Sequence, residues 1–174
     1  RGRGAAGRVP GMKTLVTYFS HSGHTAALAH QIALRLGAAE EPILKRDPGG
    51  GALSFAGGIL DAVLGRPAEV ADAEHDPADF DLVVLGTPVW AAGPTPWATG
   101  YIDRHRGALP RVALFCTSAG AGDGRALSRL EARLGREAAA RLSVTEKELK
   151  GEGLEAKLDA FLAALAAPAP AEGG

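Results

Sequence analysis

Residues 13–25 read KTLVTYFSHSGHT, an apolar run that changes abruptly into small polar residues. The first seven residues are rich in β-branched and aromatic side chains, and this composition predicts a buried strand. The polar residues end the strand, and leucine or isoleucine then recurs every four residues, which predicts a helix over 25–36. A strand that passes through a tight polar loop into a helix is typical of the first unit of an α/β domain.

The same alternation of strand and helix continues along the chain. The runs LVVLGT at 82–87 and VALFCT at 112–117 predict two more buried strands, each followed by small or turn-forming residues. Strong helix patterns cover 96–105, 124–134 and 154–165, and weaker patterns indicate a strand at 42–45, a helix at 53–64 and a strand at 141–144. Strands that are apolar on both faces and alternate with helices predict a doubly wound parallel sheet covered on both sides.

Length and composition limit the class of protein. The 174 residues suit one domain, which we expect over 12–165 between disordered tails at 1–11 and 166–174. The net charge of −1 argues against a nucleic-acid partner, and the absence of a long apolar run argues against a membrane span. Because Cys116 is the only cysteine and no secretory signal pattern is present, we expect a cytoplasmic protein.

The loop at 20–25 has the composition of an anion site. Ser20, Ser22 and Thr25 supply hydroxyl groups, Gly23 permits a tight turn, and the free N–H groups of the following helix attract a phosphate. The loop matches neither the P-loop pattern of nucleoside triphosphate sites nor the glycine fingerprint of dinucleotide sites. The sequence therefore supports neither of these two ligands. An alternative interpretation is that these hydroxyls only cap the helix.

Two further loops follow predicted strands. The segment 86–93, GTPVWAAG, contains Trp90, whose indole is suited to stacking on a flat ring or to packing in the core. The segment 117–124, TSAGAGDG, is almost without bulk, so its backbone N–H groups can approach a ligand edge closely. We expect Trp97 to pack inside the protein and Cys116 to be a small buried residue rather than a nucleophile.

These loops together resemble the flavodoxin-like family of FMN-binding proteins. The family pattern [ST]-x-[ST]-G-x-T directly after the first strand is matched at 20–25, and GTPVW at 86–90 is similar to the end of the third strand in flavodoxin-family proteins and FMN reductases. The resemblance covers residues 13–165 and implies a five-stranded parallel sheet in the order 2-1-3-4-5, with FMN at the switch point between the first and third strands.

The resemblance also implies roles for individual residues. Ser20, Ser22 and Thr25 would hold the FMN phosphate with backbone N–H groups of 21–25, residues 88–91 would line the isoalloxazine ring, and 117–120 would meet its pyrimidine edge. His24 matches no family position, and we interpret it as either a protonated neighbour of the phosphate or an exposed spectator. The expected cofactor-binding residues are Ser20, His21, Ser22, Gly23, His24, Thr25, Thr87, Pro88, Val89, Trp90, Ala91, Thr117, Ser118, Ala119 and Gly120.

The function that follows is electron transfer by an FMN protein, which accepts electrons from a redox partner protein or from NAD(P)H. The near-neutral charge and the lack of an aromatic residue in 117–124 differ from acidic electron-carrier flavodoxins. They favour an alternative, an NAD(P)H-dependent quinone, flavin or nitro reductase with one open ring face. A non-redox ligand-binding or interaction domain of the same fold is a further alternative. We expect a monomer or a homodimer.

Two other segments leave alternatives open. Residues 49–58, GGGALSFAGG, form either a lid near the ring or a partner contact, or a surface helix with a flexible entry. The acidic stretch at 72–81 could be imagined as a metal site, but acidic residues ahead of a buried strand usually form a solvated turn.

Overall fold

The computed structural model describes residues 11–47 and 52–167. Its elements, in chain order, are β1 (Thr14–Tyr18), α1 (His24–Leu36), β2 (Ala39–Pro42), α2 (Ala52–Leu64), η1 (Pro77–Asp79), β3 (Leu82–Trp90), β4 (Gly93–Pro94), α3 (Pro96–Arg104), β5 (Arg111–Ser118), α4 (Asp123–Leu134), β6 (Arg141–Thr145), α5 (Glu146–Leu149) and α6 (Leu154–Ala166). The predicted tails and the start of the 49–58 segment lie largely outside the described residues.

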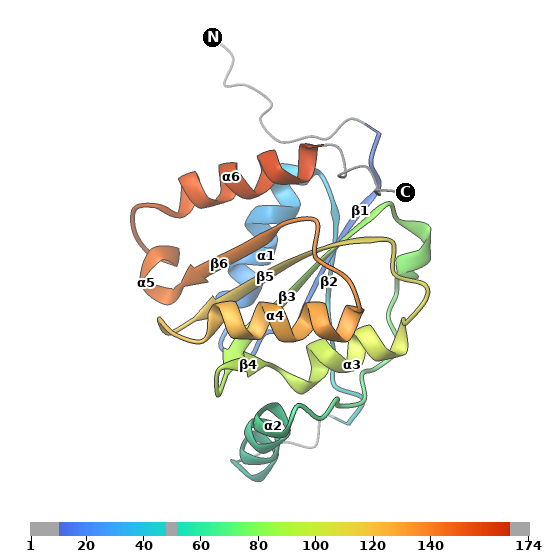
Figure 1. Cartoon of the computed structure of the whole chain (residues 1–174), viewed down its shortest axis with the longest axis vertical. Helices are drawn as coiled ribbons and strands as arrows, with labels where there is room; N and C mark the ends of the chain where they lie inside the picture. The colour runs from blue at the N-terminus through green and yellow to red at the C-terminus, as the bar shows by residue number, and fades with distance from the viewer. Residues whose placement is uncertain (1–10, 48–51, 168–174) are drawn as a thin grey trace.

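The sheet has the predicted topology. Its parallel strands are arranged in the order β2-β1-β3-β5-β6, which is the expected order 2-1-3-4-5. Tyr18 of β1 pairs with Gly86 of β3, and Pro88 of β3 pairs with Thr117 of β5. The carboxyl ends of the three central strands therefore meet at one edge of the sheet (Figure 1).

Two hydrophobic cores cover the two faces of the sheet. On one face, Ile32 of α1 and Leu158 of α6 pack in a cluster with Phe115 of β5, and all three side chains are fully buried. On the other face, Ile102 of α3 and Leu130 of α4 belong to a second cluster. Figure 1 shows α4 in front of the sheet and α1 behind it. Burial of both faces explains why the central strands are apolar without alternation.

Two strand boundaries differ from the sequence-based prediction. The β3 strand continues to Trp90 rather than ending at 87, because Val89 and Trp90 pair with β4 in an antiparallel hairpin. The β2 strand occupies 39–42 rather than 42–45. Its sequence, AEEP, carries no apolar pattern, since an edge strand that pairs only with β1 has little side-chain surface to bury.

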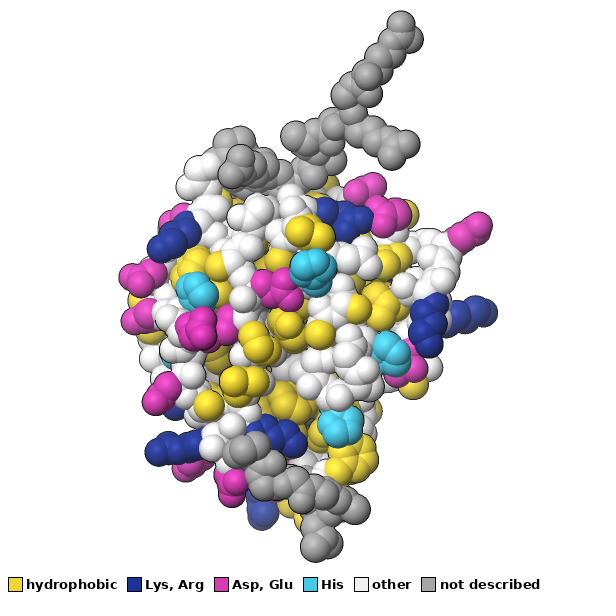
Figure 2. Space-filling view, turned by 180° about the vertical axis from the view of Figure 1, so that it is seen from behind, with side chains coloured by type: hydrophobic (Ala, Val, Ile, Leu, Met, Phe, Trp, Pro, Cys, Tyr) yellow, Lys and Arg dark blue, Asp and Glu magenta, His cyan; other side chains and the backbone are white. Residues whose placement is uncertain are grey.

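The surface carries charges of both signs. Figure 2 shows acidic, basic and apolar side chains intermixed on the face seen from behind. This distribution agrees with the near-neutral balance of the sequence, 19 basic against 20 acidic residues. Among the described residues, none of the helices has the length and apolar content that a bilayer span requires.

Gly86 gives a test of the packing beneath the candidate site. A Cβ at this buried position would overlap the ring of Phe115, which is fully buried on the adjacent strand. We expect Gly86→Ala to lower the free energy of unfolding by about 2 kcal/mol, as overpacked cores do, measured by urea denaturation. Gly124→Ala in the first turn of α4 is the matched control, because a Cβ there meets no atom within 4 Å, and it should leave the stability unchanged or raise it by up to about 1 kcal/mol. Equal stabilities for the two variants would contradict this packing.

Candidate functional site

The candidate site lies where β1, β3 and β5 end. The β1 strand has β2 on one side and β3 on the other, so the chain leaves the strand ends in opposite directions at this point. Ligands of open parallel sheets bind at such a switch point, outside the carboxyl ends of the strands. Three segments meet there: loop 1 (residues 19–25), the hairpin (88–94) and loop 3 (118–122).

Loop 1 turns at Gly23, whose φ of 91° favours glycine. The Ser20 hydroxyl accepts hydrogen bonds from the Gly23 and Ala26 N–H groups at 3.2 and 3.3 Å, so Ser20 holds the loop closed and satisfies one N–H group in the first turn of α1. Within the described part of the chain, other N–H groups near the helix start make no hydrogen bond, namely those of Ser22, His24 and Thr25. Together with the helix dipole, these amides suit an anion.

Thr25 joins loop 1 to the end of β5. Its side chain is 1% exposed, and its Oγ1 lies 2.8 Å from Oγ1 of Thr117, which is also buried. The hydroxyl of Thr25 therefore lies beneath the loop surface, whereas Ser22 is exposed. The structure brings together two of the predicted site residues, which are 92 positions apart in the chain.

His24 is not isolated in solvent. Its Nδ1 lies 3.3 Å from Oε1 of Glu146 on α5 and 3.3 Å from Oγ of Ser22, and its side chain is 28% exposed. The imidazole therefore stands between loop 1 and the carboxylate of α5. The side chain is therefore only partly exposed, and both interpretations of its role stay predictions.

The hairpin has a strained turn. Ala91 and Ala92 have φ values of 48° and 59°, the left-handed conformations that a two-residue type I′ turn requires. Each costs an alanine about 1–2 kcal/mol relative to right-handed backbone. Loop 3 packs against this turn, since a Cβ at Gly122 would lie 2.7 Å from Cα of Ala92.

A buried hydrogen bond closes the base of the hairpin. The hydroxyl of Thr87 accepts it from the N–H group of Thr95 at 3.0 Å.

Trp90 is the centre of an aromatic cluster. Its ring centroid lies 5.1–6.0 Å from those of four neighbours, and the interplanar angles of 66–87° are those of edge-to-face contacts. These neighbours are Phe19, His21, Phe55 and Trp97. The contacts fix the orientation of the indole, which remains partly exposed, while Trp97 is buried as predicted.

The α2 helix reaches the site through this cluster. Phe55 stacks on His21 at 5.0 Å, and a Cβ at Gly58 would lie 3.0 Å from both tryptophan rings. The described part of the 49–58 segment is therefore a surface helix that also contacts the site loops. Phe55 is not among the expected cofactor-binding residues, although a lid near the ring was one of the two interpretations of this segment, and the signal for it was an aromatic residue among glycines.

Two buried residues lead into loop 3. Thr117 and Ser118 still belong to β5 and are 4% and 3% exposed, whereas Ala119 and Gly120 are exposed. Oγ of Ser118 is buried and has no hydrogen-bond partner in the described protein. An unsatisfied buried hydroxyl costs about 1–3 kcal/mol, so a polar ligand atom at this edge would stabilise it.

Two other candidates for chemistry are structural. Cys116 is fully buried, and burial raises the pKa of its thiol to about 12, so it is not a reactive thiolate at neutral pH. In the acidic stretch, the buried carboxylate of Glu41 accepts the N–H groups of Glu74 and His75 at 2.5 and 3.1 Å, which holds the segment as a turn. The described residues include no group of three acidic, His or Cys side chains able to hold a metal.

No protein-family model matches the sequence, and no curated protein is significantly similar to it. Solved structures do match. A flavoprotein in complex with FMN from Lactobacillus acidophilus NCFM is 23% identical, with a TM-score of 0.65 and coverage of 80% of this chain and 97% of that one. A WrbA-like flavodoxin from Agrobacterium tumefaciens is 18% identical, with a TM-score of 0.59 over 89% and 95% of the chains. An NADH:FMN oxidoreductase is 16% identical, with a TM-score of 0.55 over 88% of each chain.

These similarities extend over nearly the full length of the matched chains at low sequence identity. Together with the strand order, they show that the fold is flavodoxin-like. Because one fold supports many functions, the fold does not identify the ligand, and any conclusion about the ligand must rest on the residues of the site.

The strained hairpin gives a second test. Ala91→Gly removes an alanine from a left-handed backbone conformation and should raise the free energy of unfolding by about 0.5–1 kcal/mol. This value is the backbone strain that is relieved minus the larger entropy that glycine loses on folding. Urea denaturation measures the change. Ala164→Gly in the exposed face of α6 is the control and should lower stability by about 1 kcal/mol. If both substitutions destabilise equally, the turn is not strained.

Proposed function

We propose that the protein binds FMN at the junction of loop 1, the hairpin and loop 3, and takes part in electron transfer. The observation that carries this proposal is the joining of three distant segments at the switch point of the sheet. Thr25 contacts Thr117 through their hydroxyls, and His21 of loop 1 contacts Trp90 of the hairpin. The FMN complex of the L. acidophilus flavoprotein, which has the same fold, supports the choice of ligand.

The residues present fit this cofactor. Free amides at the start of α1 and the exposed hydroxyl of Ser22 suit the phosphate. Residues 88–91 offer a partly apolar wall for a flat ring, and the unpartnered Oγ of Ser118 suits a polar ring edge near 117–120. When bound, FMN supplies one- and two-electron redox chemistry. The chain's own residues would hold the phosphate, orient the ring and exclude water from its buried edge.

An FMN titration tests the proposal. We expect the wild-type protein to quench FMN fluorescence with saturation, and Ser20→Ala to weaken FMN binding about tenfold, because the loop loses the hydroxyl that orders it. Riboflavin lacks the phosphate, so its weaker binding should be equal in the two proteins. Ser128→Ala, at an exposed position on α4, is the control and should bind FMN as the wild type does.

A protein that binds neither FMN nor riboflavin would contradict the proposal and favour a non-redox domain. Equal loss of FMN and riboflavin binding in Ser20→Ala would show that loop 1 does not contact the phosphate. The spectrum of bound FMN gives an independent readout, because Trp90→Ala should shift the flavin absorbance if the indole lies against the ring.

A second candidate function is NAD(P)H-dependent reduction of a quinone, flavin or nitro compound. Ala119, Gly120 and Ala121 in loop 3 are exposed and small, so no aromatic side chain of this loop covers the ring. The net charge of −1 and the intermixed charges on the face shown in Figure 2 offer no strong field there to steer a protein partner. In the quinone case, NAD(P)H gives up a hydride, and the quinone takes the two electrons and the proton of that hydride and, with one further proton from solvent, becomes a hydroquinone. The NADH:FMN oxidoreductase among the matched structures supports this class.

Steady-state turnover distinguishes the two candidates. We expect FMN-loaded protein to oxidise NAD(P)H when a quinone is added. The decrease in absorbance of the reduced nicotinamide measures this turnover. Because small loop-3 residues leave the ring open, Ala121→Trp should lower turnover at least about tenfold while FMN remains bound. FMN-loaded protein without turnover on several acceptors would instead favour a carrier that receives electrons from a protein.

A further inference from the structure

A second cavity lies beside the hairpin, outside the three site loops. It has a volume of about 340 Å³ and is formed by the end of α2, β4, α3 and α4. Figure 1 shows β4 and α3 between α4 and α2. This volume is at the lower end of the range for small-molecule sites, about 300–1,000 Å³.

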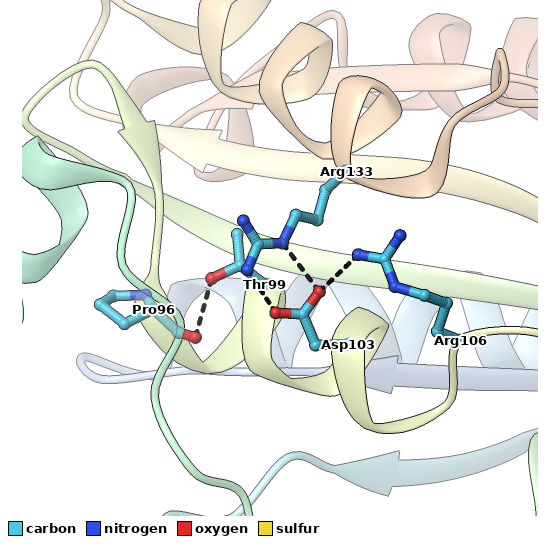
Figure 3. Close-up of polar contacts among 5 residues, drawn as sticks. All are labelled: Pro96, Thr99, Asp103, Arg106 and Arg133. Carbon is cyan, nitrogen blue, oxygen red and sulfur yellow. Dashed lines mark hydrogen bonds and ion pairs between the residues drawn. The ribbon is translucent and has the colours of Figure 1, made fainter.

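The cavity is rich in arginine, and its positive charge is only partly neutralised. Arg133 is held by Asp103, which accepts two hydrogen bonds from it and one from Arg106 at 2.9 Å (Figure 3). The hydrogen bond from Arg133 lowers the pKa of Asp103, so this carboxylate stays charged beside the arginine. Two other lining residues, Arg66 and Arg129, form no ion pair within the described residues. The cavity therefore has two guanidinium groups available to an anion.

One of these arginines is held in place. Nη1 of Arg129 lies 3.4 Å from the carbonyl oxygen of Ala62, in the last turn of α2, where it compensates the negative end of the helix dipole. A Cβ at Gly93 would lie 2.6 Å from the same nitrogen, so the missing side chain makes room for the guanidinium. An arginine with limited freedom loses less entropy when its planar group binds a phosphate.

The remaining walls are apolar. Val63 and Leu64 are 50% and 52% exposed, and Pro94 closes the cavity on the side of the hairpin. Exposed aliphatic side chains beside free arginines suit a ligand that combines a flat apolar ring with a phosphate. A phosphorylated nucleoside has both parts.

The cavity is close to the candidate flavin site along the chain. Pro94 follows Ala91 of the hairpin by three residues, which span at most about 10 Å of extended backbone. A dinucleotide of ordinary length can therefore have one end at the hairpin and the other in the cavity.

We propose that this arginine cavity binds the 2′-phosphoadenosine end of NADPH, and that the protein consequently prefers NADPH to NADH. The inference rests on the reductase function proposed above, because it assigns a donor to that reaction. The 2′-phosphate is the group that distinguishes the two donors, and Arg66 and Arg129 are the groups that recognise it. Arg66 is the exposed member of the pair, and its side chain makes no hydrogen bond within the described protein, so its removal should not affect folding.

Calorimetry on FMN-loaded full-length protein tests the cavity directly. Adenosine 2′,5′-bisphosphate should bind, and Arg66→Ala should weaken it about tenfold, the loss expected for one charge-assisted contact. Arg46→Ala is the matched control, since it removes another exposed arginine, which pairs with Glu69 outside the cavity, and it should leave the affinity unchanged. Adenosine 5′-monophosphate, which has no 2′-phosphate, should bind at least about tenfold more weakly and should not distinguish the variants.

Kinetics give the second readout. Arg66→Ala should raise KM for NADPH about tenfold with KM for NADH unchanged, whereas Arg46→Ala should alter neither. The inference is overturned if the bisphosphate does not bind, if Arg66→Ala binds it as the wild type does, or if inorganic phosphate binds equally well. Binding of the bisphosphate can be measured on protein without FMN, so failure of the flavin proposal and failure of this one give different results.

Discussion

The parallel pairing of β1 with β3 is the constraint on which the remaining structure depends. Each strand is buried on both faces, so the pairing removes a long apolar segment from water while satisfying its backbone hydrogen bonds. It also fixes where the polar residues after each strand lie. Because Tyr18 is opposite Gly86, loop 1 and the hairpin leave the sheet side by side. The pairing of β3 with β5 adds loop 3 at the same edge.

The loops at this edge hold one another in position through a few short-range contacts. The Thr25–Thr117 hydrogen bond joins loop 1 to the end of β5, and Gly122 allows loop 3 to lie directly against the hairpin turn. The turn itself is unfavourable for alanine, so its conformation must be held by its surroundings, including the packing of Trp90. Strain supported in this way is common where a ligand must meet a preformed surface.

The α2 helix links the candidate flavin site to the arginine cavity. Its N-terminal half contacts the hairpin through Phe55, and its last turn is held by Arg129 of α4. Both sites therefore share the hairpin and α2 as walls. A donor bound in the cavity and a ring bound at the strand ends would contact the same two elements, which is the arrangement that a two-site redox enzyme needs.

The sequence by itself determined the fold and the position of the candidate site. Apolar runs such as 13–19 and 82–87 predict buried parallel strands, and the polar residues that end them fall at one edge in any sheet of this order. It did not determine the edge strand at 39–42, because a strand with little buried surface leaves no apolar pattern. Only the tertiary structure decided that the Thr25 hydroxyl is buried against Thr117, that Phe55 contacts Trp90, and that Arg66 and Arg129 share a cavity. Each of these contacts joins residues far apart in the chain, and local sequence patterns carry no information about which distant side chains meet.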